Sequence, residues 1–272
     1  MPSGKSGRRS REAAGAGGGA GVDRLYGVHS VLEALRAGRR RALRLLVRRG
    51  AASRSEIGII VEAAAAAGVP VLEVSGDEIG RGAEPDGNPQ GVVLEAELLP
   101  EVGLQELCVA SRGPRRLVAL DGVEDPRNVG AIARAAEASG VCGLILTRRR
   151  APPLSAVVAR ASAGAIEWLP VARVTNLARA VETMKRRGFW VVGADSAAGE
   201  SLFEVPDRVL QGDLLVILGA EGRGLRPGVR KLLDHVVRIP MLGRIESLNV
   251  SVASGILLFD LLRRSRECNR PG

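Results

Sequence analysis

From Arg116 onward, short apolar runs alternate regularly with amphipathic segments along the chain. The apolar runs predict β-strands at RLVALDGV, VCGLILT, LPVARV, FWVVGAD, DLLVILGAE and HVVRIPM. The segments between them predict helices, among them NVGAIARAAEASG and NLARAVETMKRRG. Strands that are apolar throughout and are separated by helices form a parallel sheet with both faces covered. We therefore predict an α/β domain with a parallel sheet over residues 116–266, closed by a final helix.

A smaller unit with the same kind of alternation occupies residues 23–97. Its pattern predicts helices at YGVHSVLEALRAG and SEIGIIVEAAAAAG, and strands at ALRLLV, VPVLEV and GVVLEAE. The segment PDGNPQ has the composition of a turn and predicts a loop inside this unit. The chain is thus expected to hold a small N-terminal α/β domain, joined to the larger one by a linker over residues 98–115 with one short helix.

Both ends of the chain lack the large apolar residues that a fold needs. Residues 1–22 consist mainly of Gly, Ala, Ser and Arg, which cannot bury enough surface to offset the entropy of ordering. We expect a disordered basic tail over residues 1–22 and a short second tail over residues 267–272.

The net charge of +9, with 39 Lys and Arg against 30 Asp and Glu, favours a polyanionic partner such as RNA. Eight arginines and no acid lie between Arg36 and Arg54. A solvated charged surface is the ordinary interpretation of such a run, but beside a basic tail a contact with a phosphate backbone is at least as well supported. The aromatic content of 2% disfavours a surface on which successive bases stack.

Cysteine and histidine are too few and too scattered for several kinds of chemistry. Cys108, Cys142 and Cys268 have no metal-ligand spacing, and they suit a reducing compartment, which predicts a cytoplasmic protein. His29 and His235 are far apart, which disfavours a zinc site and a Ser-His-Asp hydrolase. No apolar run reaches the roughly 18 to 20 residues that span a bilayer. We therefore expect no metal and no membrane partner.

Polar residues gather where three of the predicted strands end. Singly, they have ordinary explanations, such as a helix cap at Asn128. Because ligands bind at the carboxyl ends of parallel strands, one shared site is the more economical interpretation of all three groups. Arg134 lies among small and apolar neighbours, and we expect it to pair with a buried anion. The groups are Asn128 and Arg134, then Glu221 among Gly219, Gly222 and Gly224, then Arg244, Glu246, Ser247, Asn249 and Ser251.

Three ordered motifs in these segments resemble those of the SpoU (TrmH) family of the SPOUT superfamily, which are RNA ribose 2′-O-methyltransferases. The motifs are LDGVEDPRNVGAIARAAEASG, LVILGAEGRGL and IPMLGRIESLNVSVASGILLFDLL. The N-terminal YGVHSVLEAL is similar to the members that carry a ribosomal-protein-like substrate-binding domain and methylate a guanosine of 23S rRNA. The resemblance covers essentially all of the chain after the first tail.

The resemblance implies a C-terminal domain with a trefoil knot, S-adenosylmethionine as cofactor, and a homodimer whose active site takes residues from both subunits. It also implies that Gly219, Ile239, Met241 and Leu248 contact the cofactor. The substrate that it implies is ribosomal RNA, most directly a guanosine of 23S rRNA. A tRNA ribose 2′-O-methyltransferase and an inactive RNA-binding relative are the alternatives. A Rossmann-type nucleotide enzyme is disfavoured, because DGVEDPRNVG lacks the G-x-G-x-x-G pattern.

A ribose 2′-hydroxyl is a poor nucleophile, so the enzyme must hold it in line with the methyl group and favour loss of its proton. We expect Arg134 to approach the target phosphate and ribose, with Asn128 orienting its loop. Glu221 is expected to anchor the loops and to pair with Arg134. Ser247 and Asn249 are expected to shape the cofactor pocket and to position the nucleotide.

Overall fold

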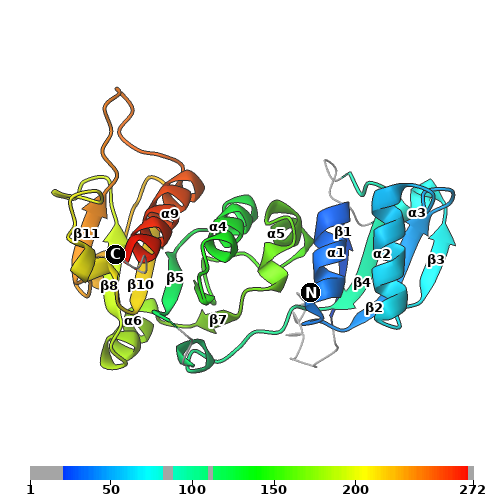
Figure 1. The fold of residues 1–272 in the computed structure, drawn as a ribbon, viewed down its shortest axis with the longest axis horizontal. Coiled ribbons are helices and arrows are strands. Elements are labelled where there is room, and N and C mark those ends of the chain that lie inside the picture. Colours follow the sequence, from blue (N-terminus) through cyan, green and yellow to red (C-terminus); the bar gives the residue numbers. More distant parts are fainter. Residues whose placement is uncertain (1–20, 82–87, 110–112, 269–272) are drawn as a thin grey trace, which may run out of the picture.

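The computed structural model describes residues 21–81, 88–109 and 113–268, with side chains described as far as residue 265. Two sheets lie toward opposite ends of an elongated molecule, and helices between them connect the two parts (Figure 1). Residues 1–20 and 269–272 of the expected tails, and residues 85–87 of the PDGNPQ loop, fall outside the described residues. The final helix extends to Cys268, so it includes the first two residues of the tail expected at 267–272.

The N-terminal part contains a four-stranded sheet with the order β1-β4-β2-β3. Strand β1 was not among the predicted elements, and it begins within the segment assigned to the basic tail. Asp23 and Arg24 interrupt its apolar pattern, and the strand forms by antiparallel pairing with β4, from Val22 opposite Glu97 to Tyr26 opposite Val93. The strands are β1 Val22–Tyr26, β2 Ala42–Arg48, β3 Val71–Val74 and β4 Val92–Glu97.

Two longer helices and one short helix accompany this sheet. Helices α1 (Val28–Ala37) and α2 (Ser55–Ala66) pack against each other, and α3 (Gly76–Gly80) follows β3. Helix α1 ends at Gly38, whose φ of 58° is the left-handed conformation in which glycine commonly ends helices. The two longer helices and the three predicted strands therefore occur where the apolar pattern indicated them, whereas α3 was not predicted.

The C-terminal part is built on a seven-stranded sheet with the order β7-β6-β5-β10-β8-β11-β9. Each pairing in this sheet is parallel, as the apolar strands predicted. The two-residue strand β9 was too short for the pattern to indicate. The strands are β5 Arg116–Asp121, β6 Gly143–Thr147, β7 Val171–Val174, β8 Trp190–Ala194, β9 Glu200–Ser201, β10 Leu214–Gly219 and β11 His235–Arg238.

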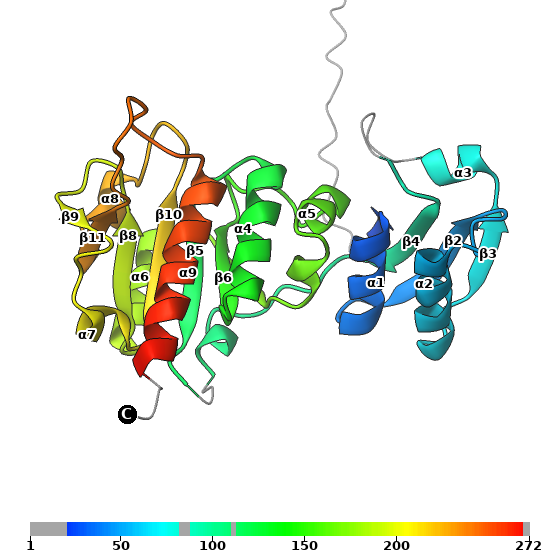
Figure 2. The ribbon, with the colours of Figure 1, turned by 45° about the horizontal axis from the view of Figure 1, so that its top comes forward.

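Helices cover both faces of this sheet, and alternate residues of each strand enter two separate apolar cores. Val118 and Leu120 of β5 face the core beneath α4 and α9, whereas Leu117 and Ala119 face the core beneath α6. In Figure 2, α4 and α9 lie side by side in front of the sheet and α6 lies behind it. The helices are η1 Glu106–Cys108, α4 Pro126–Ala138, α5 Ala156–Ala161, η2 Ala165–Glu167, α6 Leu177–Arg186, α7 Asp207–Leu210, α8 Pro227–Arg230 and α9 Val250–Cys268.

Strand register brings the ends of four strands together. Gly219 of β10 lies opposite Asp121 of β5, and Leu218 lies opposite Ala194 of β8, which pairs in turn with Val237 of β11. The loops that leave β5, β8, β10 and β11 therefore start side by side at one edge of the sheet. The trefoil knot that the family resemblance implies stays a prediction. Across the described residues, no helix has the length and apolar character that a membrane span requires.

Candidate active site

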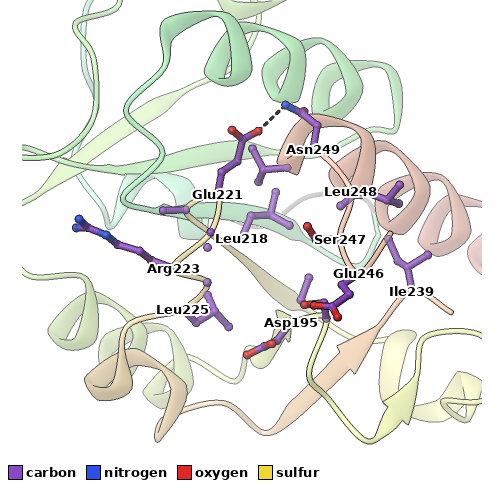
Figure 3. A pocket seen from close by; sticks show the side chains of 18 of the residues that line it. Asp195, Leu218, Glu221, Arg223, Leu225, Ile239, Glu246, Ser247, Leu248 and Asn249 are labelled. Carbon is purple, nitrogen blue, oxygen red and sulfur yellow. Dashed lines mark hydrogen bonds between the residues drawn. The ribbon is translucent and has the colours of Figure 1, made fainter. Parts of the chain in front are cut away.

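A pocket of about 770 Å³ opens at the carboxyl edge of the seven-stranded sheet. The loop after β10 and the segment 239–249 before α9 form its walls, and the end of β8 forms its floor. Its volume is in the range of about 300 to 1,000 Å³ that small-molecule sites usually have. Figure 3 shows Glu221 and Asn249 at one end of the pocket and Asp195 and Glu246 at the other. Two of the three predicted polar groups therefore line one pocket.

A hydrogen-bonded cluster connects all three motifs at the rim of this pocket. The Glu221 Oε1 atom accepts from Asn249 Nδ2 at 2.5 Å and from Asn128 Nδ2 at 3.2 Å. The Asn249 amide also donates to Asn128 Oδ1 at 3.1 Å. Residues that are 28 to 121 positions apart in the sequence thus meet at one carboxylate.

Asn249 has a structural role and a role in the cluster at the same time. Its Oδ1 accepts from the backbone N–H of Ser251 at 2.8 Å, so it caps α9, while its Nδ2 faces Glu221. Asn128 has no such double role, because the cap of α4 is Asp125, whose carboxylate accepts from Arg127 N–H at 2.8 Å. Asn128 lies inside the first turn of α4 and is therefore free to join the cluster.

The glycine-rich loop after β10 folds back closely on its own start. A Cβ added to Gly219 would lie 2.4 Å from the carbonyl carbon and 2.6 Å from the oxygen of Gly224, contacts that real Cβ atoms do not make. Gly222 and Gly224 have positive φ angles of 73° and 61°, which suit glycine. The loop therefore needs glycine at these three positions, and its backbone forms part of the pocket wall.

Two carboxylates that the motifs did not single out also hold the site. Asp121 is buried at the end of β5, and it accepts from Arg226 N–H at 2.9 Å and from Arg226 Nε at 2.5 Å. This pairing ties the far end of the glycine-rich loop to β5. Asp195 follows β8, lines the pocket and forms an ion pair with Arg230 of α8. Their positions directly at strand ends are the signal that could have indicated both.

The residues expected at the cofactor lie together. Gly219, Ile239, Met241 and Leu248 line the pocket, as do Ser247 and Glu246. Arg244 and Ser251 do not line it, and Ser251 instead donates to Asn249. Segment 239–249 forms neither helix nor strand, so its amide and carbonyl groups are not committed to a regular hydrogen-bond pattern. Such backbone, with the apolar side chains of Ile239, Met241 and Leu248 beside it, fits an adenosine-containing cofactor.

The surroundings of Arg134 differ from those that the sequence predicted. The expected pairing with a buried anion is wrong: the side chain is exposed and has no carboxylate partner among the described residues. Glu221 binds Asn128 and Asn249 instead. Six residues make about 1.7 helical turns, so Arg134 lies on a different face of α4 from Asn128. Its small neighbours reflect the packing of the other faces of α4, which bury Ile132, Ala133 and Ala136.

Within the described residues, no group of three or more His, Cys, Asp or Glu side chains is arranged to hold a metal ion. The pocket itself is lined by amide, carboxylate, hydroxyl and guanidinium side chains and by the backbone of two loops.

Two family models together match most of the chain. The model described as the SpoU rRNA methylase family matches residues 115–259. A model described as RNA 2′-O ribose methyltransferase substrate binding matches residues 24–102. The first match contains the pocket, the first two motifs and most of the third, and the second match contains all but the first two residues of the four-stranded sheet.

Individual proteins resemble the chain over about two thirds of its length or more. A 23S rRNA (guanosine-2′-O-)-methyltransferase RlmB from Pseudomonas aeruginosa is 39% identical over 245 residues, which cover 89% of this chain and 96% of the relative. The RlmB of Bordetella pertussis is 46% identical over 176 residues, covering 64% of this chain and 71% of the relative. The crystal structure of the SpoU methyltransferase AviRb from Streptomyces viridochromogenes with AdoMet (S-adenosylmethionine) has a TM-score of 0.76 and 26% identity, with 92% of each chain covered.

Proposed function

The chain belongs to the SpoU rRNA methylase family, and from this membership we propose that it methylates the ribose 2′-hydroxyl of a guanosine in 23S ribosomal RNA. The observation that carries the proposal is the cluster of Asn128, Glu221 and Asn249, which joins the three family motifs at the rim of one pocket. The alignment covers 96% of the P. aeruginosa relative, and the name of that relative supports a 23S rRNA guanosine as the substrate.

The pocket residues would hold S-adenosylmethionine through backbone groups of the loop after β10 and of segment 239–249. Ile239, Met241 and Leu248 offer apolar contacts for the adenine ring. When bound, this cofactor supplies a methyl group that is electrophilic because it is attached to a sulfonium.

The protein's own groups would prepare the ribose hydroxyl. Arg134 places a guanidinium near the 2′-oxygen and the adjacent phosphate, which favours the ionised hydroxyl electrostatically. Glu221, Asn128 and Asn249 hold the two loops and α4 in one arrangement. Ser247 lies in the pocket wall with its hydroxyl available to orient the nucleotide.

A homodimer would place Arg134 of one subunit at the pocket of the other subunit, since Arg134 does not line the pocket of its own subunit. Arg134 is exposed on α4, next to α9, which carries Val252 and Phe259 with exposures of 51% and 48% (Figure 2). Seven residues separate these two side chains, so they share one face of α9. An apolar stripe beside a free cation suits a subunit interface in which Arg134 enters the partner's pocket.

Replacing Phe259 with Glu is expected to convert the dimer into monomers and to abolish methyl transfer, because a carboxylate would be buried unpaired in the interface. Sedimentation velocity at micromolar protein concentration measures the first effect, and a methyl-transfer assay measures the second. The control is Phe203→Glu, because Phe203 is 54% exposed but lies outside α4 and α9. A dimeric, active Phe259→Glu variant would contradict this interface.

The arginine run of the N-terminal part separates into paired and free side chains. Arg48, Arg49 and Arg54 are exposed, and their side chains form no hydrogen bond or ion pair within the described residues. They lie between the end of β2 and the start of α2, so three free guanidiniums on one short segment are accessible to phosphates. The others have partners in the protein: Arg36 with Glu33, Arg39 with backbone carbonyls, Arg40 with Asp23 and Glu167, Arg41 with Glu97, and Arg44 with Glu95.

Replacing Arg48, Arg49 and Arg54 together with Gln is expected to weaken RNA binding and to reduce its dependence on salt. Each lost phosphate contact lowers the slope of log K against log salt by about 0.7 to 0.9, so the triple variant should lose about 2 to 3. The matched control changes the paired Arg36, Arg41 and Arg44 to Gln, which removes the same charge. Equal effects of the two triple variants would show that only net charge matters.

The first test of the proposed function is ligand-dependent thermal unfolding. S-adenosylmethionine at about 100 times its Kd should stabilise the protein by about 2.7 kcal/mol, whereas NAD and ATP should not stabilise it. Transfer of a labelled methyl group to 23S rRNA, with analysis of the modified nucleoside, then identifies the product. Stabilisation by NAD or ATP instead, with no methyl transfer, would refute the proposal.

A further inference from the structure

A buried ion pair connects the two parts of the molecule. Arg40 follows α1 of the N-terminal part, and Glu167 lies in η2 of the C-terminal part. Arg40 Nε donates to Glu167 Oε2 at 3.0 Å, and Arg40 Nη2 donates to Glu167 Oε1 at 2.9 Å. The two side chains are 1% and 0% exposed. Asp23 of β1 accepts a third bond from Arg40 at 3.0 Å.

Further contacts surround this pair along one seam, where α1 lies next to α5 and η2 (Figures 1 and 2). Arg39 Nη1 donates to the Leu169 carbonyl at 2.5 Å, and Trp168 Nε1 donates to Glu33 Oε2 at 2.9 Å. A Cβ at Gly164 would lie 2.5 Å from the Cβ of Glu33, so the two surfaces touch directly. The N-terminal part is therefore docked on the C-terminal part as well as joined to it through the linker.

The geometry of the pair favours this arrangement of the two parts over others. Domains in one chain usually move relative to each other unless their interface is extensive and apolar. Here, separation or rotation would leave a guanidinium and a carboxylate without their partners in a buried seam. Burial raises the pKa of the Glu167 carboxyl, and the Arg40 and Arg39 guanidiniums oppose that rise. The bidentate hydrogen bonding also depends on the orientation of the two side chains, because the planar guanidinium must face both carboxylate oxygens.

We propose that Arg40 and Glu167 are positioning residues that fix the N-terminal part relative to the pocket and thereby select which ribose is methylated. This inference rests on the proposed function. RNA held at Arg48, Arg49 and Arg54 lies at a set distance from the pocket only if the two parts are rigidly docked. Arg40, although it belongs to the basic run, acts on the RNA through this docking and does not touch it.

The test compares wild-type enzyme with Glu167→Gln, which keeps the shape of the side chain and removes its charge, and with Arg40→Lys, which keeps the charge and loses the planar guanidinium. Small-angle X-ray scattering of the full chain reports the arrangement of the two parts. Steady-state kinetics on 23S rRNA separates KM from kcat, and mapping of 2′-O-methyl groups reports the modified position. Asp213→Asn is the control, because its ion pair with Arg115 takes no part in the seam contacts between the two parts.

Glu167→Gln is expected to broaden the distance distribution, to raise KM for RNA by about tenfold or more, and to spread methylation to neighbouring nucleotides. Arg40→Lys should act in the same direction with smaller effects, and Asp213→Asn should match wild type. Affinity for S-adenosylmethionine should not change in any variant.

A folded Glu167→Gln variant with wild-type scattering, KM and product position would overturn the positioning role. If Glu167→Gln does not fold, the same readouts on Arg40→Lys decide. Failure of the wild-type enzyme to methylate any RNA would instead refute the proposed function. This result can be distinguished from failure of the positioning role, because scattering reports the docking of the two parts without any reaction.

Discussion

Replacing Arg134 with Ala is expected to lower the rate of methyl transfer by at least about 100-fold, the usual effect of removing a group that assists proton loss. Folding should not change, because Arg134 is exposed and exposed substitutions usually alter the free energy of unfolding by no more than about 0.5 kcal/mol. Single-turnover transfer from labelled S-adenosylmethionine to 23S rRNA measures the rate with both ligands saturating.

A mixture of inactive variants shows which subunit supplies Arg134. Consider a dimer of one Arg134→Ala chain and one Asn249→Ala chain. The Arg134→Ala chain keeps an intact Asn128–Glu221–Asn249 cluster, and the Asn249→Ala chain would supply an intact Arg134 to it, so one of the two sites would be complete. Activity should therefore reappear when the two variants are co-expressed. If Arg134 acts within its own subunit, no intact site forms and activity stays absent. Arg179→Ala, an exposed arginine on α6, is the surface control and should be fully active.

Replacing Gly219 with Ala is expected to weaken cofactor binding strongly. The added Cβ would lie within 2.7 Å of three backbone atoms of Gly224 and Leu225, so the loop that forms the pocket wall must move. Such overpacking costs about 1 to 3 kcal/mol. If that cost falls on the bound state, affinity drops by about 5- to 150-fold at about 1.4 kcal/mol per tenfold. Isothermal titration with S-adenosylmethionine measures the change.

Gly228→Ala is the matched control for this substitution. Gly228 has no atom within 4 Å of an added Cβ, and it follows closely on the same glycine-rich loop. Its variant should bind S-adenosylmethionine with wild-type affinity. Unchanged affinity in a folded Gly219→Ala protein would mean that the loop after β10 does not form the cofactor site.

Local patterns in the sequence were enough to indicate the main elements and the edge where the site lies. The strand β5 is buried at every position, and a strand of this kind is readable because apolar residues run through it. The carboxyl ends of such strands then identify the loops that hold Asn128, Glu221 and Asn249. The strand β1 was missed because its stability comes from pairing with β4, which is about 70 residues away in the sequence.

The remaining differences between the predictions and the structure come from contacts between residues that are distant in the sequence. Nothing near Arg40 indicates that Glu167, 127 residues later, neutralises it in a buried seam. The eight arginines of that run look equivalent in the sequence, and only the fold separates the three free ones from those with partners. Arg134 looked buried because its neighbours are small, but the neighbours pack on other faces of α4.

The most direct test of the central claim is a map of 2′-O-methylation across all ribosomal and transfer RNAs in cells with and without the gene for this protein. We expect one 2′-O-methylguanosine of 23S rRNA to disappear without the gene and to return with the wild-type chain but not with Arg134→Ala. Loss of a tRNA methyl group instead, or a map with no change, would contradict the proposed function.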